Sequence, residues 1–282
     1  MKHTKSMRFF REGLTHLILA ACSAVFAFPF LWMLTNSIKT KDEIWAVPPQ
    51  VLPAQPQWIN YGDVFKNSIF MRYMWNSLYT SVIITVITLI TSAMFAYALT
   101  NIRFRGKKLL FGLIMVTYIV PTAATNIPAY IVLSRMKLID THFGLILSTC
   151  SSIFNIFYFR TMFMQINPAI MEAARVDGAS HPAILWRIVA PMSASSYMTL
   201  GILGFISCYN SYVWPSLILR TKSKYVISIG LQLFFSTDGA YGLKWGTIMA
   251  SCCVTIFPLL LMFFLGQKWI MNGITSDSGV KA

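Results

Sequence analysis

Charged side chains that could contact another molecule occur in the stretch of residues 167–180. Between two long apolar segments, the stretch carries two acids and one base, Glu172, Asp177 and Arg175. Carboxylates and a guanidinium at this spacing can form charge-assisted hydrogen bonds with a facing surface. The residue types therefore indicate a contact surface rather than a catalytic centre.

The same stretch carries the start and stop signals of one short helix. Asn167 can accept a hydrogen bond from a first-turn N–H, and Pro168 fits the first helical position, where an N–H has no partner. Gly178 can adopt the left-handed conformation that closes a helix. About ten residues rise roughly 15 Å, half the hydrocarbon thickness of a bilayer. We therefore expect a helix that lies at the membrane surface.

The composition of the whole chain indicates a membrane protein. Of its 282 residues, 56% are hydrophobic and only 11% are charged, whereas soluble domains contain about 25% charged residues. So few charges cannot cover a water-facing surface of this size. The net charge of +14 is therefore not read as a nucleic-acid signal, because Lys and Arg gather in the loops of membrane proteins.

Six uncharged segments are long enough to cross a bilayer. They predict an all-α integral membrane protein with six transmembrane helices in a single domain, residues 1–282. The predicted spans are Leu14–Leu34, Ser77–Leu99, Leu109–Leu133, Phe143–Phe159, Ser195–Leu219 and Gly246–Gly266.

Basic residues in the short flanking segments predict the orientation, since such residues favour the cytoplasmic side. They are Lys2, Lys5, Arg8 and Arg11 before the first span, and Arg103, Arg105, Lys107 and Lys108 in one short loop. We expect both termini and the 167–180 helix in the cytoplasm, which agrees with an even number of spans. The basic start and the long apolar run after it favour an uncleaved first span.

Polar and aromatic side chains in the fifth predicted span are candidates for lining a solute path. Tyr209, Asn210 and Trp214 lie close together there, and a carboxamide in hydrocarbon needs a hydrogen-bonding partner. Neutral donors and acceptors beside aromatic faces suit sugars. A hydrogen bond between helices explains Asn210 equally well, so both alternatives stay open.

Other chemistry finds little support in the sequence. The five cysteines lie in apolar stretches without a metal-ligand spacing, and neither His16 nor His142 has a second ligand one helical turn away. Gly106-Lys107-Lys108 lacks the hydroxyl residue and preceding glycine of a phosphate-binding loop. We therefore expect no catalytic residue, no metal site and no bound cofactor on this chain.

The 167–191 segment resembles the EAA signature of ABC importer permeases. The residues that carry the resemblance are Glu172-Ala173-Ala174, Gly178, Ile188 and Pro191, with Ala190 where the family usually has Leu. The run from Glu172 to Ser180 and the Phe205–Leu219 segment are similar to the carbohydrate-uptake branch, whose members are MalG-like subunits. The likeness extends over essentially the whole chain.

The resemblance implies a fold and a set of partners. It implies a type I importer permease with a cytoplasmic coupling segment, residues 167–191, and a cytoplasmic tail, residues 267–282. A second, MalF-like permease would complete the pathway, two copies of a cytoplasmic ATPase subunit would use ATP and Mg, and an extracytoplasmic solute-binding protein would deliver a carbohydrate. The setting would be the lipid of a bacterial cytoplasmic membrane, with no nucleic acid involved.

The resemblance also assigns roles to particular residues. It places ATPase coupling at the positions of the signature and its helix, namely Glu172, Ala173, Ala174, Asp177, Gly178, Ile188 and Pro191. Tyr209, Asn210 and Trp214 remain the candidates for the substrate pathway.

One alternative is a secondary transporter driven by a proton or ion gradient. Such transporters usually place acidic residues inside their spans, and the six predicted spans contain none. A receptor or structural membrane protein is a third possibility, but it would not need a capped helix of this residue order.

Overall fold

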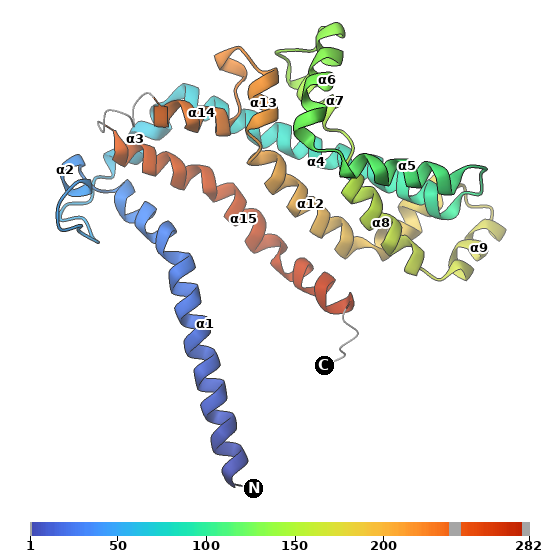
Figure 1. Ribbon diagram of the computed structural model, residues 1–282, viewed down its shortest axis with the longest axis horizontal. Helices are drawn as coiled ribbons and strands as arrows, with labels where there is room; N and C mark the ends of the chain where they lie inside the picture. The colour runs from blue at the N-terminus through green and yellow to red at the C-terminus, as the bar shows by residue number, and fades with distance from the viewer. Residues whose placement is uncertain (1, 237–243, 278–282) are drawn as a thin grey trace. The chain divides into compact units, whose positions relative to one another are not determined.

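A computed structural model describes residues 2–236 and 244–277, and every regular element in these ranges is a helix (Figure 1). Three helices are long and apolar enough to cross a membrane, at Arg11–Ser37, Ser68–Asn101 and Trp245–Trp269. Three pairs of helices with a sharp bend between them raise the number of possible spans to six among the described residues. The predicted all-α membrane class is confirmed.

The chain forms two compact units. One comprises Met1–Ser68 with Leu231–Phe257, and the other comprises Ile69–Gly230 with Pro258–Ala282. The helices α14 (Ile227–Phe234) and α15 (Trp245–Asp277) are each divided between the units. The 167–180 stretch and the pathway candidates all lie in the second unit.

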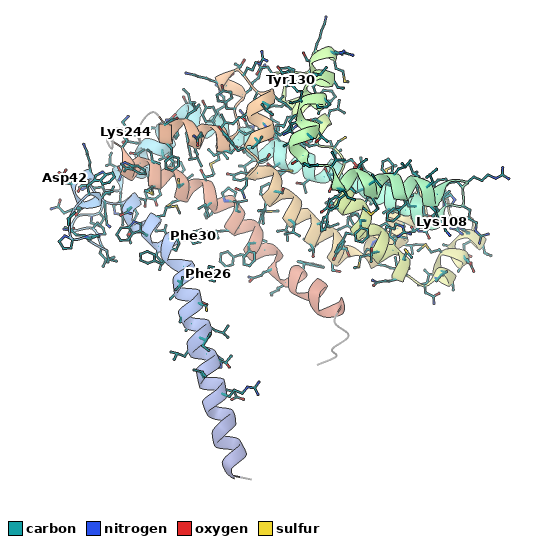
Figure 2. All side chains as sticks on the ribbon, viewed as in Figure 1. Phe26, Phe30, Asp42, Lys108, Tyr130 and Lys244 are labelled. Carbon is teal, nitrogen blue, oxygen red and sulfur yellow. The ribbon has the colours of Figure 1, made fainter. Side chains whose placement is uncertain are left out.

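The first unit contains α1 (Lys2–Ser37), α2 (Lys41–Ile44) and α3 (Ile59–Lys66). Phe26 and Phe30 of α1 are 77% and 55% exposed and stand out from the helix (Figure 2). Such an apolar, exposed surface is suited to lipid or to another apolar helix.

A buried lysine organises the loop after α1. The Lys39 ammonium donates to Asn36 Oδ1 at 2.8 Å and lies 4.6 Å from the centre of the Trp32 ring. Burial lowers the pKa of Lys39, against a smaller opposite effect of the Glu43 carboxylate. Hydrogen bonds and a cation–π contact therefore compensate for removing this charge from water.

The second unit is arranged around α4 (Ser68–Asn101). One face of this helix is rich in buried hydroxyl side chains, each 8% exposed or less: Ser77, Thr80, Ser81, Thr85, Thr88 and Ser92. Small hydroxyl residues allow other helices to approach closely and can bond to groups on them.

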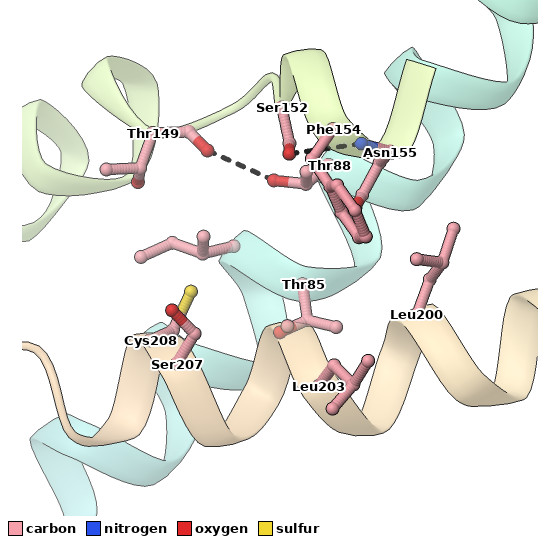
Figure 3. Close-up of a pocket in the computed structure, with 12 residues that line it drawn as sticks. Thr85, Thr88, Thr149, Ser152, Phe154, Asn155, Leu200, Leu203, Ser207 and Cys208 are labelled. Carbon is pink, nitrogen blue, oxygen red and sulfur yellow. Dashed lines mark hydrogen bonds between the residues drawn. The ribbon is translucent and has the colours of Figure 1, made fainter. Parts of the chain in front are cut away.

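The helix α4 carries partners for a break in the fourth predicted span. That span is divided into α7 (His142–Ser148) and α8 (Ile153–Gln165), which meet at 46°. Thr88 Oγ1 donates to the Thr149 carbonyl at 3.0 Å (Figure 3), and Thr91 Oγ1 donates to the Cys150 carbonyl at 2.6 Å. Carbonyls freed by a helix break inside a membrane need partners in the protein, and α4 supplies them.

The third predicted span is also two helices. Its parts, α5 (Lys107–Ile119) and α6 (Thr122–Arg135), meet at 105°, far more than a kink. Val120 is extended, with φ −69° and ψ 125°, because the ring of Pro121 disfavours a helical conformation at the residue before it. Pro128, by contrast, lies inside α6.

The remaining helices of this unit are short except for one. They are α9 (Pro168–Val176), α10 (His181–Ile184), a π-helical turn (Leu185–Val189), α11 (Ala190–Met192), α12 (Ala194–Tyr209) and α13 (Val213–Ile218). The helical stretch His181–Met192 meets α12 at 83°. The predicted fifth span, residues 195–219, thus contains α12, a break and α13.

A cluster of hydrogen bonds on Asp140 joins two loops of the second unit. The Asp140 carboxylate accepts bonds from the backbone N–H groups of Arg220 and Thr221, from the Thr221 hydroxyl at 2.6 Å, and from Lys224 Nζ at 3.0 Å. Desolvation raises the pKa of Asp140, but the bonds from Thr221, Arg220 and Lys224 together outweigh it and hold the pKa well below its usual range. The bonds favour the ionised carboxylate.

We predict that Asp140→Asn lowers the stability of the purified protein by about 1–2 kcal/mol, because the charge-assisted bonds are lost. The expected readout is a drop of a few degrees in the thermal midpoint in detergent. Asp63→Asn is the control, since Asp63 is exposed on α3. An equal midpoint for the Asp140 and Asp63 variants would show that the cluster contributes nothing.

The low pKa of Asp140 also predicts how the stability of the fold depends on pH. A depressed pKa stabilises the fold above the pKa of an unfolded aspartate, about 4, and that stabilisation is lost only as the pH falls toward the folded pKa. The difference in midpoint between the natural chain and Asp140→Asn should therefore stay constant from pH 8 to pH 5. A difference that shrinks within this window would contradict the assignment.

Candidate functional site

The predicted short helix at residues 167–180 is present as α9. The Ala169 N–H donates to Asn167 Oδ1 at 3.0 Å, and Pro168 occupies the first turn. The helix ends at Val176, and Gly178 just beyond it has a φ of +80°, which is accessible to glycine at little cost. The Gly178 N–H donates to the Arg175 carbonyl and the Ala179 N–H to the Ala174 carbonyl. These capping bonds confirm the boundaries expected from the sequence.

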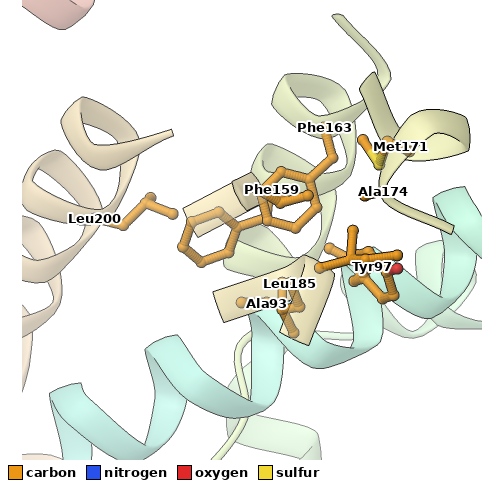
Figure 4. Packing of buried hydrophobic residues seen from close by; sticks show 11 residues of the cluster. Ala93, Tyr97, Phe159, Phe163, Met171, Ala174, Leu185 and Leu200 are labelled. Atoms are coloured by element: carbon orange, nitrogen blue, oxygen red, sulfur yellow. The ribbon is translucent and has the colours of Figure 1, made fainter. Parts of the chain in front are cut away.

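One face of α9 is fixed in a hydrophobic cluster. Met171 is 3% exposed and Ala174 is 8% exposed, and both pack among buried side chains of α4, α8, α10, the π-helical turn and α12 (Figure 4). We call this group the α9 core cluster; its buried members are Ala93, Ala96, Tyr97, Phe159, Phe163, Met171, Ala174, Ile184, Leu185, Val189 and Leu200. The packing holds α9 in one orientation.

The other face of α9 is open. Glu172, Ala173 and Asp177 are exposed, as is Gly178, and Val176 is 88% exposed. Nothing lies within 4 Å of a Cβ built on Gly178. Two acids, two small residues and an exposed valine therefore form a surface that another protein can approach closely. We call these five residues the α9 outer face.

Three of the expected coupling residues lie elsewhere. Ala174 faces the α9 core cluster, Ile188 is half-buried against it, and Pro191 is exposed on α11. The signature residues therefore fall into two groups: some form the α9 outer face, and others lie behind it.

A π-helical turn precedes Pro191. The Ala190 N–H donates to the Leu185 carbonyl five residues back, and Pro191 has no N–H with which to continue an α-helical ladder. The wider turn accommodates one additional residue. The α-helical pattern of bonds four residues apart resumes where the Ser193 N–H donates to the Val189 carbonyl at 3.0 Å.

Polar bonds tie the signature region to the end of α4. Arg175 Nη2 donates to the Asn101 carbonyl at 3.0 Å, and the Tyr97 hydroxyl lies 3.1 Å from His181 Nδ1. The sequence analysis missed Tyr97, Asn101 and His181 as contributors. No local pattern signals such contacts, because the paired residues are more than seventy positions apart in the chain.

The three pathway candidates lie in different environments. Tyr209 is buried, with 1% of its side chain exposed, whereas Asn210 is exposed at the end of α12. Trp214 Nε1 donates to Ser148 Oγ at 2.9 Å and borders a cavity of about 170 Å³. They do not form one contiguous lining.

Metal-ligating and redox-active groups are scattered in the part of the chain that the structure describes. The residues 2–236 and 244–277 contain no group of three or more His, Cys, Asp or Glu side chains that could hold a metal ion. All five cysteines are free thiols.

The fold is that of a transmembrane chain of a bacterial ABC importer. It matches a chain from the crystal structure of a bacterial ABC transporter that imports the acidic polysaccharide alginate, with a TM-score of 0.84 and 24% sequence identity. The match covers 94% of this chain and 98% of the other. A chain from the alginate transporter in complex with a periplasmic protein bound to an alginate pentasaccharide matches with a TM-score of 0.64.

The chain belongs to the family described as the binding-protein-dependent transport system inner membrane component, whose model matches residues 90–275. It is 28% identical over its full length to the arabinooligosaccharides transport system permease protein AraQ of Bacillus subtilis, with 99% of that protein covered. It is 30% identical to the inner membrane ABC transporter permease protein YcjP of Escherichia coli, with 93% of this chain and 94% of that protein covered. An sn-glycerol-3-phosphate transport system permease protein, UgpE of Yersinia pestis, is 28% identical, over 95% of this chain and 98% of UgpE.

The chain is therefore a multi-pass inner membrane permease of an ABC importer, and the expected family is confirmed. As the membrane component, it is not the enzyme of the transporter. The gradient-driven secondary transporter considered as an alternative is set aside.

Met171→Ala should destabilise the signature region, because Met171 is 3% exposed within the α9 core cluster. Truncation of a buried methionine costs about 2–5 kcal/mol, so the thermal midpoint of the purified chain should fall by several degrees. Met164→Ala is the matched control, since Met164 is 61% exposed on α8. Equal midpoints for the two variants would show that α9 is not packed as described.

Proposed function

We propose that this chain forms, with a second permease, the pathway through which an ABC importer takes up a sugar or oligosaccharide. The observation that carries the proposal is the α9 outer face, held by the α9 core cluster and exposed in the signature of a permease family. Relatives named for arabinooligosaccharide, glycerol-3-phosphate and alginate transport support a carbohydrate or a related polyol as the solute.

The α9 outer face is proposed as the docking surface for a separate ATPase subunit. Glu172 and Asp177 offer carboxylates to basic groups of that subunit, and Ala173 and Gly178 let its surface come close. Two copies of the ATPase, using ATP and Mg, would serve this chain and its partner permease. This assignment places α9, both termini and the tail, residues 267–282, on the cytoplasmic side.

The geometry supports a direct mechanical route from the docking surface to the membrane part. A displacement of α9 acts on α4 through the packing of Met171 and through the Arg175 bond to the Asn101 carbonyl. The helix α4 in turn bonds the break between α7 and α8 through Thr88 and Thr91. Closure of the ATPases can thereby rock several helices together, since packed cores move as units rather than deform continuously.

A solute-binding protein outside the membrane is proposed to deliver the sugar to this pathway. The alginate transporter has been captured in complex with a substrate-bound periplasmic protein, which supports this arrangement by analogy. Among the three pathway candidates, Asn210 is the one with an exposed side chain that can meet a solute.

Gly178→Arg tests the docking surface. The arginine side chain would project into open space next to the α9 outer face, so it should block the approach of the ATPase without disturbing the core. We expect loss of ATPase co-purification and a fall of tenfold or more in ATP-driven sugar uptake, equivalent to about 1.4 kcal/mol of docking energy or more.

Gly178→Ala is the control, because it shares the backbone strain of a positive φ, roughly 1 kcal/mol, but adds no bulk. It should retain most of the uptake. If the arginine variant assembles and transports like the natural chain, α9 is not the docking surface.

Asn210→Leu tests the solute path. Loss of a carboxamide that bonds the sugar should raise the KM for uptake about threefold to tenfold and leave complex assembly unchanged. Uptake and sugar selectivity identical to those of the natural chain would remove Asn210 from the pathway.

A further inference from the structure

A cavity in the second unit has a lining that no assigned role explains. It lies between α4, α8 and α12, beside the break between α7 and α8, and has a volume of about 350 Å³ (Figure 3). Volumes of about 300–1,000 Å³ are usual for small-molecule sites. Polar groups come from all three sides, with Thr85 and Thr88 on α4, Asn155 on α8 and Ser207 on α12.

One buried hydroxyl in the lining has no strong partner in the protein. Thr85 is 8% exposed, and its hydroxyl interacts at most with the thiol of Cys208, which is a weak hydrogen-bonding group. Asn155 is also 8% exposed and borders the cavity, and its backbone N–H bonds to Ser152 Oγ. Buried polar groups without partners cost free energy, so such groups commonly mark a position where something else binds.

The first turn of α8 lies beside the same cavity. Ser152, Phe154 and Asn155 border it; the Asn155 N–H is bonded to Ser152 Oγ, whereas the other N–H groups of a first turn lack acceptors within their own helix. Transporters often build solute sites from such interrupted helices. Here the interruption is held open by bonds from α4 to the Thr149 and Ser152 carbonyls, at 3.0 and 3.4 Å.

The chemistry of the lining selects the class of ligand. The lining contains no charged side chain; it combines hydroxyls, one carboxamide and a thiol with apolar and aromatic groups, including Phe154. Hydroxyl and amide groups can each exchange hydrogen bonds with an alcohol, and an aromatic face packs on the C–H groups of a sugar ring. A multiply charged solute would find no counter-ion there.

We propose that this cavity is a binding site for one neutral sugar ring, with the Thr85 hydroxyl and the Asn155 amide bonding ring hydroxyls. The proposal rests on the carbohydrate function argued above and adds a site to it. The proposed site is distinct from the pathway candidates Tyr209, Asn210 and Trp214, none of which borders this cavity.

Protection of Cys208 tests occupancy directly, because its thiol borders the cavity. The assembled importer in lipid nanodiscs would carry a version of this chain in which Cys208 is the single cysteine, and its modification by N-ethylmaleimide would be timed. l-Arabinose and d-glucose, each added alone, should slow the modification about tenfold at ten times the dissociation constant, since only empty sites react. A chain with Cys253 as the single cysteine is the control and should react at the same rate with and without sugar.

Thr85→Val tests the hydroxyl in a way that spares the fold. Valine has a similar shape, and the hydroxyl that it removes bonds to nothing strong in the protein. We expect a threefold to tenfold rise in the KM for sugar uptake. Thr161→Val is the matched control, because Thr161 lies exposed on α8 away from the cavity.

The outcomes separate this proposal from the function on which it rests. Sugar uptake with no Cys208 protection by either sugar, or with a natural KM for Thr85→Val, would overturn the cavity site and leave the importer function intact. An importer that carries a solute of another class and no sugar would overturn the proposed function itself. A cavity that holds only water would likewise overturn the cavity site and leave the importer function intact.

Discussion

A backbone group inside a bilayer must find a hydrogen-bonding partner in the protein, and the second unit is arranged around this constraint. The break between α7 and α8 leaves carbonyls outside the α-helical ladder, and the hydroxyls of Thr88 and Thr91 on α4 donate to two of them. A helix that supplies donors must lie close to the carbonyls that it serves. The small hydroxyl residues of α4 therefore provide both the short distance and the bonds, which explains why this part of its buried face is rich in hydroxyl groups.

The same helix continues to the signature region, so one rigid element serves both ends of the unit. Tyr97 and the Asn101 carbonyl meet His181 and Arg175, while Ala93 and Ala96 pack in the α9 core cluster. The helix α9 thus has one exposed face and one face in the core, as the proposed docking role requires. The exposed part of α9 is small, but its orientation depends on contacts with five other elements.

The features set by neighbouring residues could be predicted from the sequence. The cap of α9 by Asn167, its end just before Gly178 and the membrane character of the chain follow from local rules, and each agrees with the structure. The 105° bend at Pro121 and the break after Ser148 could not be judged, because hydropathy reports that a segment is apolar and not that its helix is continuous. The contacts of Tyr97, Asn155 and Thr85 join distant segments and leave no local pattern.

The π-helical turn Leu185–Val189 determines how the helices before it, α9 and α10, are rotated about the helix axis. Each residue of an α-helix turns the chain by about 100°, so the one additional residue in this turn determines the direction in which α10, and with it α9, leaves α12. Losing that residue would not shorten the signature region noticeably, but it would rotate the α9 outer face by more than a quarter of a circle. The number of residues between Gly178 and Pro191 thus determines the direction in which the α9 outer face points, independent of which side chains occupy the interval.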